Sequence, residues 1–179
     1  MMTLDQRVIE TALGWHHAGR AVWLCTVLQT WGSSPRAPGT MMVISDSGEG
    51  CGSLSGGCIE EDFLARLAEG HYRIHSQVVR YGEGGRQTQG KLPCGGSLDV
   101  MVEYLVADND SGHMLQAMHQ ALRGKTRLLK TATVNKRAKQ ANYGDDGGAA
   151  GASLSASRGR VTGWCRPGIA GGRLLYRGL

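Results

Sequence analysis

Three short loops contain the residue types that could bind a ligand or carry out thiol chemistry. They read Gly32-Ser33-Ser34-Pro35, Ser55-Gly56-Gly57-Cys58 and Pro93-Cys94-Gly95-Gly96. Glycine lets a backbone approach a ligand closely, and consecutive N–H groups at a helix N-terminus bind anions without a lysine. Serine hydroxyls would add donors for a phosphate or for the edge of a heterocycle. The alternative is that these loops are turns whose glycines only satisfy local backbone geometry.

Two cysteines in these loops are candidates for a reactive thiol. Cys58 stands at the predicted start of a helix, where the helix dipole favours the thiolate. Glu60, Glu61 and Asp62 follow in the same turn and oppose a negative charge there. Cys94 lies in a tight loop that would expose it, although a small residue in such a loop needs no chemistry. The sequence leaves both the reactive and the inert interpretation open.

The remaining cysteines and the histidines do not have the spacing of a metal site. The five cysteines are an odd number without a CxxC pair, which disfavours a disulfide framework or a four-thiolate zinc site. Cys25 lies in an apolar run and is predicted to be core. His71 and His75 are four residues apart in a segment that reads as extended, so we expect no directly bound metal. The hydrolase, zincin, P-loop and dinucleotide fingerprints are also missing from the sequence.

Regular elements alternate with these loops and predict an α/β fold of the mixed α+β type. Apolar periodicity and breaker residues predict helices over 4–18, 58–69 and 112–123. Apolar runs rich in strand formers predict strands over 21–28, 40–44, 51–54, 73–81, 98–106 and 126–134. We therefore expect residues 1–135 to form a single domain of mixed β-sheet with packed helices, and no C-terminal Rossmann domain. Residues 136–179 are predicted to be a basic, glycine-rich tail that is partly ordered, with short strands at 161–164 and 173–176.

Length and charge exclude several classes of protein. The 179 residues suffice for one domain and a tail. Residues 1–122 carry a net charge of −5 and residues 123–179 a net +10, so the overall +5 belongs to the tail. The tail lacks a basic amphipathic helix and interleaved aromatic residues, so we expect no nucleic-acid partner. No apolar stretch is long enough to span a membrane and the N-terminus does not read as a secretory signal, so a cytoplasmic protein is expected.

The three loops in this order resemble the N-terminal domain of the XdhC/CoxI family, whose members are maturation factors for molybdenum hydroxylases such as xanthine dehydrogenase. The resemblance covers about residues 5–130. It is carried by Thr26-Val27, Gly32-Ser33-Ser34-Pro35, Pro38-Gly39, Gly52 to Glu60, Tyr81-Gly82, Cys94-Gly95-Gly96 and Val100 to Glu103. Their combination is specific, whereas any one of these short motifs means little.

The resemblance implies a protein that binds the molybdopterin form of the molybdenum cofactor transiently, assists its sulfuration and inserts it into a hydroxylase apoenzyme. The cofactor-binding candidates carried over by motif are Ser33, Ser34, Gly56, Gly57, Cys58, Glu60, Cys94, Gly95 and Gly96. Cys58 or Cys94 would relay sulfur or touch the sulfur ligands of the metal. A cysteine desulfurase and a second copy of the chain, in a homodimer, are implied as further partners. NAD binding is not expected without the second domain that family members usually carry.

Three functional hypotheses follow from these observations. The first is a cofactor chaperone without turnover of its own. The second is an enzyme that uses Cys58 for thiol or persulfide chemistry, and no catalytic residue is assigned for it beyond the possible roles of Cys58 and Cys94. The third is a protein-interaction module in which the loops are structural and the basic tail docks an acidic partner. The resemblance favours the first.

Overall fold

The computed structural model of the chain describes residues 1–33, 36–74, 76–82, 95–124, 127–131, 153–157 and 173–176. The helices within these ranges are α1 (Leu4–His17), α2 (Cys58–Ala68) and α3 (Asn109–Leu122). The strands are β1 (Val22–Trp31), β2 (Met41–Ser45), β3 (Gly50–Gly52), β4 (Ser76–Tyr81), β5 (Ser97–Leu105), β6 (Arg127–Thr131), β7 (Ser153–Ser157) and β8 (Arg173–Tyr176). No helix of the described part has the length and apolar character needed to cross a membrane.

Five strands form a sheet in the order β3-β2-β1-β5-β4. The predicted α+β class is confirmed, but every pairing in this sheet is antiparallel, where the sequence had suggested a mixed sheet. The reason is that β1–β2, β2–β3 and β4–β5 are neighbours both in sequence and in the sheet, as in hairpins, whereas parallel neighbours need a longer crossover. A second sheet has the order β7-β6-β8 and is also antiparallel.

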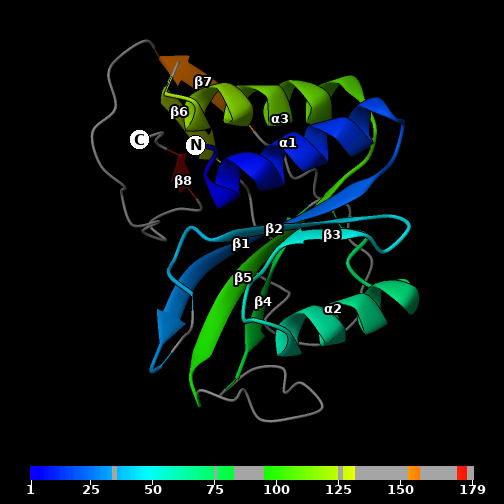
Figure 1. Cartoon of the computed structure of the whole chain (residues 1–179), viewed down its shortest axis with the longest axis vertical. Coiled ribbons are helices and arrows are strands. Elements are labelled where there is room, and N and C mark those ends of the chain that lie inside the picture. Colours follow the sequence, from blue (N-terminus) through cyan, green and yellow to red (C-terminus); the bar gives the residue numbers. More distant parts are fainter. Residues whose placement is uncertain are drawn as a thin grey trace.

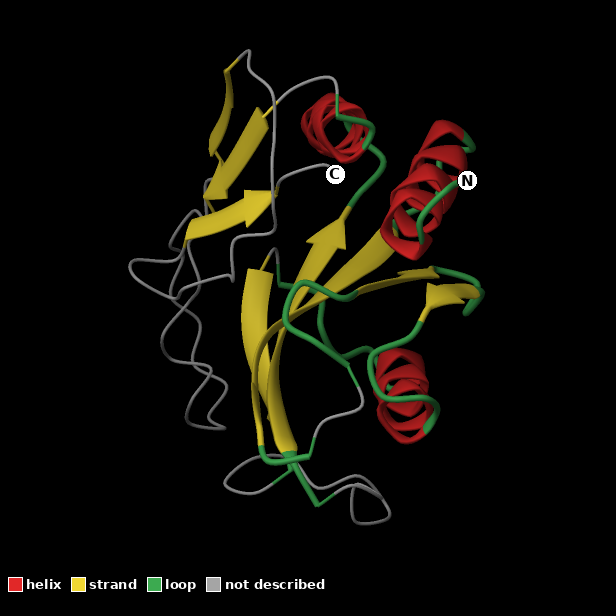
Figure 2. Ribbon diagram, turned by 60° about the vertical axis from the view of Figure 1, so that its left-hand side comes forward, coloured by secondary structure: helices red, strands yellow, loops and turns green. Residues whose placement is uncertain are grey.

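Helices cover both faces of the larger sheet (Figure 1). The helices α1 and α3 lie side by side over one face, and α2 lies against the other face, as the second view also shows (Figure 2). The alternation of β1 follows from this arrangement, because Val22 and Leu24 point into the core beneath α1 and α3, while Trp23 and Cys25 point into the core beneath α2. The nearly continuous apolar run in the sequence is therefore a strand buried on both faces.

The helix α2 is fixed to the sheet by aromatic contacts. The rings of Phe63 and Tyr72 stack 4.8 Å apart, with 5° between their planes. The indole Nε1 of Trp23 donates a hydrogen bond of 2.8 Å to the backbone carbonyl of Tyr72. Tyr72 has a φ of +62°, which a bulky residue rarely adopts. These contacts set the position of α2, and through it the position of the loop that precedes the helix.

A buried ion pair connects the two sheets. Lys130 of β6 donates from Nζ to the Oε2 atom of Glu103 on β5. The Lys130 side chain is fully buried and that of Glu103 is 3% exposed. Two charges taken out of water need each other, because each alone would carry its full desolvation penalty. The pair therefore fixes how β6 sits on the larger sheet.

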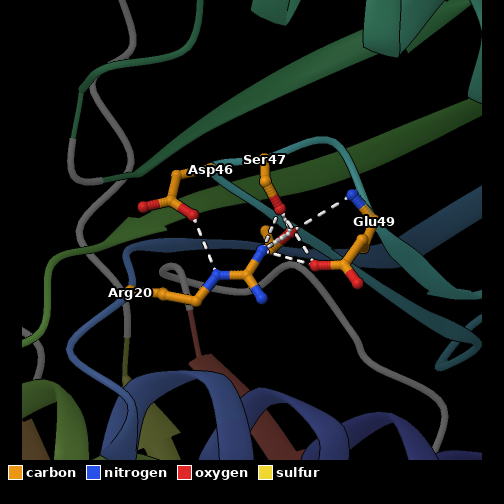
Figure 3. A network of polar contacts seen from close by, with 5 residues as sticks. Arg20, Asp46, Ser47 and Glu49 are labelled. Carbon is orange, nitrogen blue, oxygen red and sulfur yellow. Dashed lines mark hydrogen bonds and ion pairs between the residues drawn. The ribbon is translucent and has the colours of Figure 1, made fainter.

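A polar network on the surface ties Arg20, in the connection between α1 and β1, to the turn between β2 and β3 (Figure 3). Arg20 donates from Nε to Asp46 at 3.1 Å and from Nη2 to Glu49 at 2.6 Å. Its Nη2 also donates to the hydroxyls of Ser45 and Ser47. The hydrogen bond from Arg20 lowers the pKa of Glu49. The network shapes this turn and lies apart from the three candidate loops in the sequence.

The predicted elements agree with the observed ones, with one strand missed and one prediction untested. Helices and strands were expected at or near the positions of α1 to α3, β1 to β6 and β8, and they are found there. The strand β7 was not predicted. The strand predicted over 161–164 lies outside the described residues. The boundary at residue 135 stays a prediction, although β7 and β8 beyond it both pair with β6.

Candidate functional site

The second loop, residues 53–58, is built around the carboxylate of Glu60. Oε1 of Glu60 accepts hydrogen bonds from the hydroxyl of Ser53 at 2.7 Å, from the N–H of Leu54 at 2.6 Å and from the N–H of Ser55 at 3.0 Å. Oε2 accepts from the hydroxyl of Ser55 at 2.7 Å and from the N–H of Gly57 at 2.9 Å. One side chain thus organises the whole loop from the first turn of α2.

The two glycines of this loop are required by their backbone conformations. Gly56 has a φ of +91° and Gly57, the N-cap of α2, a φ of +143°. An added Cβ at either position would meet no atom within 4 Å. Left-handed φ values rather than crowding therefore explain these glycines, and the space beside them is open.

The charge of Glu60 is stabilised by these contacts. Burial opposes ionisation, but the hydrogen bonds from Ser53 and Ser55 outweigh it and lower the pKa of Glu60 to about 2. The backbone donors that the sequence analysis offered to a phosphate are therefore already used by an internal carboxylate. In this structure Glu60 is a positioning residue for the loop, and its predicted contact with the cofactor remains untested.

Cys58, the first residue of α2, is partly exposed and carries a free thiol. The Glu60 carboxylate occupies the same helix N-terminus, where its Oε2 atom accepts from the N–H of Gly57. Cys25 is fully buried, as predicted, and burial followed by the nearby Glu103 raises the pKa of its thiol well above the ordinary value. Cys94 lies outside the described residues, as does Ser34.

The first and third loops meet at one end of the sheet. A Cβ added to Gly96 would lie 2.6 Å from the carbonyl oxygen of Ser33 and 2.8 Å from that of Trp31. A Cβ added to Gly82 would overlap the carbonyl oxygen of Gly96. The close approach that these glycines permit is thus between backbone segments. Ser33 and Gly95 are exposed beside this contact, and Gly96 is buried within it.

Two residues that sequence reasoning missed lie beside this junction. The guanidinium of Arg80 lies 4.3 Å from the centre of the Trp31 ring. It also donates to both carboxylate oxygens of Asp99, at 2.7 Å from Nε and at 3.0 Å from Nη2. Their positions in the sequence could have identified Trp31 and Arg80, because Trp31 directly precedes Gly32 and Arg80 directly precedes the Tyr81-Gly82 motif.

Within the described residues, the candidate site therefore has two parts. The first consists of Ser33, Gly95 and Gly96, which lie together where β1 ends and β5 begins. Gly56, Gly57, Cys58 and Glu60 form a separate loop whose hydrogen bonds described above all lie within residues 53–60. Across the described ranges, no three His, Cys, Asp or Glu side chains are grouped so that they could hold a metal ion.

Comparisons with known proteins support the resemblance seen in the sequence. Residues 15–82 match the XdhC and CoxI family. Over 105 residues, 58% of this chain, the sequence is 32% identical to the molybdenum cofactor insertion chaperone PaoD of Escherichia coli (strain K12). Over 58 residues, 32% of this chain, it is 36% identical to a probable xanthine dehydrogenase subunit of Bacillus subtilis (strain 168).

A solved structure shares the fold. The crystal structure of a xanthine dehydrogenase from Bacillus halodurans superposes with a TM-score of 0.61 over 99% of this chain and 53% of that chain, at 20% sequence identity. The matched segments span only 33% of the Escherichia coli relative and 18% of the Bacillus subtilis one. The matched family segment contains the first two loops, Trp31 and Arg80, while Gly95 and Gly96 lie beyond it. These matches show that residues 15–82 of this chain are similar to the XdhC and CoxI family.

Proposed function

We propose that this chain is an accessory protein in the maturation of a molybdenum hydroxylase, and that its cargo is a molybdopterin-type molybdenum cofactor. The observation that carries the proposal is the 32% identity over 105 residues to a molybdenum cofactor insertion chaperone. The similarity of residues 15–82 to the XdhC and CoxI family supports the same role. The chain would bind the cofactor transiently, assist its sulfuration and pass it to the apoenzyme.

The chemistry of the loops fits such a cargo. The cofactor combines a phosphate with a flat pterin whose edge carries donors and acceptors. Ser33 offers an exposed hydroxyl, and Cys58 offers a partly exposed thiol next to the open space at Gly56 and Gly57. Because Glu60 already fixes the second loop, a ligand would meet a preformed surface and lose less affinity to loop ordering. We further propose that the chain acts in the cytoplasm. Its proposed partners are the hydroxylase apoenzyme, a cysteine desulfurase and a second copy of the chain.

A binding titration tests the first part of this proposal. The reduced, anaerobic protein is expected to bind molybdopterin cofactor with micromolar or tighter affinity, followed by pterin fluorescence. Ser33→Ala and Cys58→Ser should each weaken binding about five- to tenfold, because each removes one hydrogen bond or thiol contact with the cofactor. Cys51→Ser is the matched control, because Cys51 is also partly exposed but lies on β3. No binding, or equal losses in all three variants, would contradict the proposal.

Sulfuration is tested separately with the double variant Cys58→Ser/Cys94→Ser. If a thiol of this chain relays sulfur, the double variant, loaded at a cofactor concentration above its weakened Kd, should deliver the cofactor without the sulfido ligand, so that the target hydroxylase gains cofactor without activity. The measurement is cyanide-releasable sulfur on the reconstituted hydroxylase. Full sulfuration by the double variant would remove the thiol role and leave the insertion role standing.

A further inference from the structure

The cluster of Trp31, Arg80 and Asp99 has features that the packing of the fold does not require. The sheet register places Gln29, Asp99 and Arg80 side by side on β1, β5 and β4. Trp31 lies two residues after Gln29 on β1. Arg80 and Val78 share a face of β4, and Val78 packs on the core beneath α1 and α3. The cluster thus continues that face toward the end of the sheet.

The guanidinium of Arg80 is held in a fixed orientation. Asp99 binds its Nε and Nη2 atoms in a bidentate contact, and its Cζ atom lies over the Trp31 ring, 4.3 Å from the ring centre. Of its five N–H groups, these contacts use two. Among the described residues, the Nη1 atom has no hydrogen-bond partner that would use the remaining edge. Arg80 therefore presents a fork whose geometry is set before any ligand arrives.

The exposure of the three side chains determines what the cluster shows to solvent. The Asp99 side chain is only 12% exposed and both its oxygens face Arg80, whereas the Arg80 side chain is 40% exposed. Trp31 is 36% exposed, a large value for an indole. The outward surface thus consists of N–H donors beside an aromatic ring. This combination suits an oxyanion carried by a flat ring system, which can accept from the fork and stack on the ring.

We propose that Arg80 and Trp31 bind the oxyanion and the ring plane of a planar anionic heterocycle, with Asp99 as the positioning residue that aims the guanidinium. This inference rests on the proposed function, because that function identifies the heterocycle as a pterin. The site adjoins Ser33, two residues beyond Trp31, and the loop at Gly95 and Gly96 that packs against it. The Arg80 guanidinium would offer a ligand side-chain donors, whereas the backbone donors of the second loop are already bound to Glu60.

The test uses two fluorescent probes, 6-carboxypterin, which carries a carboxylate, and pterin, which does not. The wild-type chain should bind 6-carboxypterin about tenfold more tightly than pterin, about 1.4 kcal/mol. Arg80→Gln should abolish this preference and leave pterin binding unchanged. Trp31→Leu should weaken both probes by a similar factor. Arg73→Gln is the matched control, since Arg73 is an exposed arginine just before β4 and should change neither.

A second variant guards against an effect of folding. Arg80→Gln leaves the Asp99 carboxylate without its partner, so the compensated variant Arg80→Gln/Asp99→Asn is measured beside it, with circular dichroism to show that both are folded. Loss of the preference in both variants supports the site. Retained tenfold preference in a folded variant overturns it. If these variants still bind molybdopterin cofactor like the wild type, only this inference fails, whereas absence of cofactor binding by the wild-type chain would refute the proposed function itself.

Discussion

Replacement of Lys130 by methionine is expected to lower the free energy of unfolding by about 3–5 kcal/mol, because it leaves the Glu103 carboxylate buried without its partner. The apolar stem of methionine fills much of the same volume, so the loss reports the charge rather than a cavity. The measurement is urea unfolding of the wild type and Lys130→Met at pH 7, followed by far-ultraviolet circular dichroism.

A double variant identifies the cause of this loss. Removal of one partner leaves an uncompensated buried charge, whereas replacement of both partners by apolar side chains leaves none. The double variant Lys130→Met/Glu103→Leu should therefore recover most of the stability that Lys130→Met loses. If Lys130→Met is as stable as the wild type, the claim that buried Glu103 needs Lys130 as its partner is wrong.

Glu60→Gln is expected to lower the free energy of unfolding by about 2 kcal/mol at pH 7, after allowance for the partial exposure of the side chain. An amide replaces one acceptor oxygen with a donor nitrogen. It cannot accept from both groups that converge on Oε2, the Ser55 hydroxyl and the Gly57 N–H. Glu61→Gln is the control, because Glu61 is the exposed neighbour on the same helix turn. Thermal and urea unfolding of the three proteins would measure the difference.

The same group contributes an acid-sensitive part of the stability. The folded pKa of Glu60, about 2, lies below the unfolded value of about 4.3, so the stabilisation is complete above about pH 5 and is lost as the pH falls toward 2. The gap between wild type and Glu60→Gln should therefore close over this range. A gap that stays constant from pH 7 to pH 3 would show that the carboxylate charge is not what holds the loop.

The sequence was most informative where local rules decide the structure. The start of α2 at Cys58 and the buried strand around Cys25 followed from breakers and apolar patterning, and both are observed. The role of Glu60 had a local signal as well, because it stands at the third helical position after the N-cap Gly57, the spacing of a capping box. A carboxylate at that spacing indicates an occupied helix N-terminus rather than a vacant anion site.

Contacts between distant segments could not be derived in this way. Nothing in the single sequence pairs Lys130 with Glu103, since a lysine in a strand ordinarily points to solvent. The meeting of Gly96 with Ser33 depends on sheet register, and so does the Arg80–Asp99 contact. The strand β7 was missed because its serine- and alanine-rich sequence has little strand propensity, and its pairing is supplied by β6.

The strand order of the smaller sheet has a consequence for the route of folding. β7 and β8 each pair with β6, so β6 is the template on which both later segments must be laid. Each pairing joins segments that are far apart in the sequence. Such contacts form slowly, because the chain must lose the entropy of closing the loop before the contact contributes favourable free energy. We therefore expect β7 and β8 to pair only after β6 has been anchored to the larger sheet, so that these two strands form last.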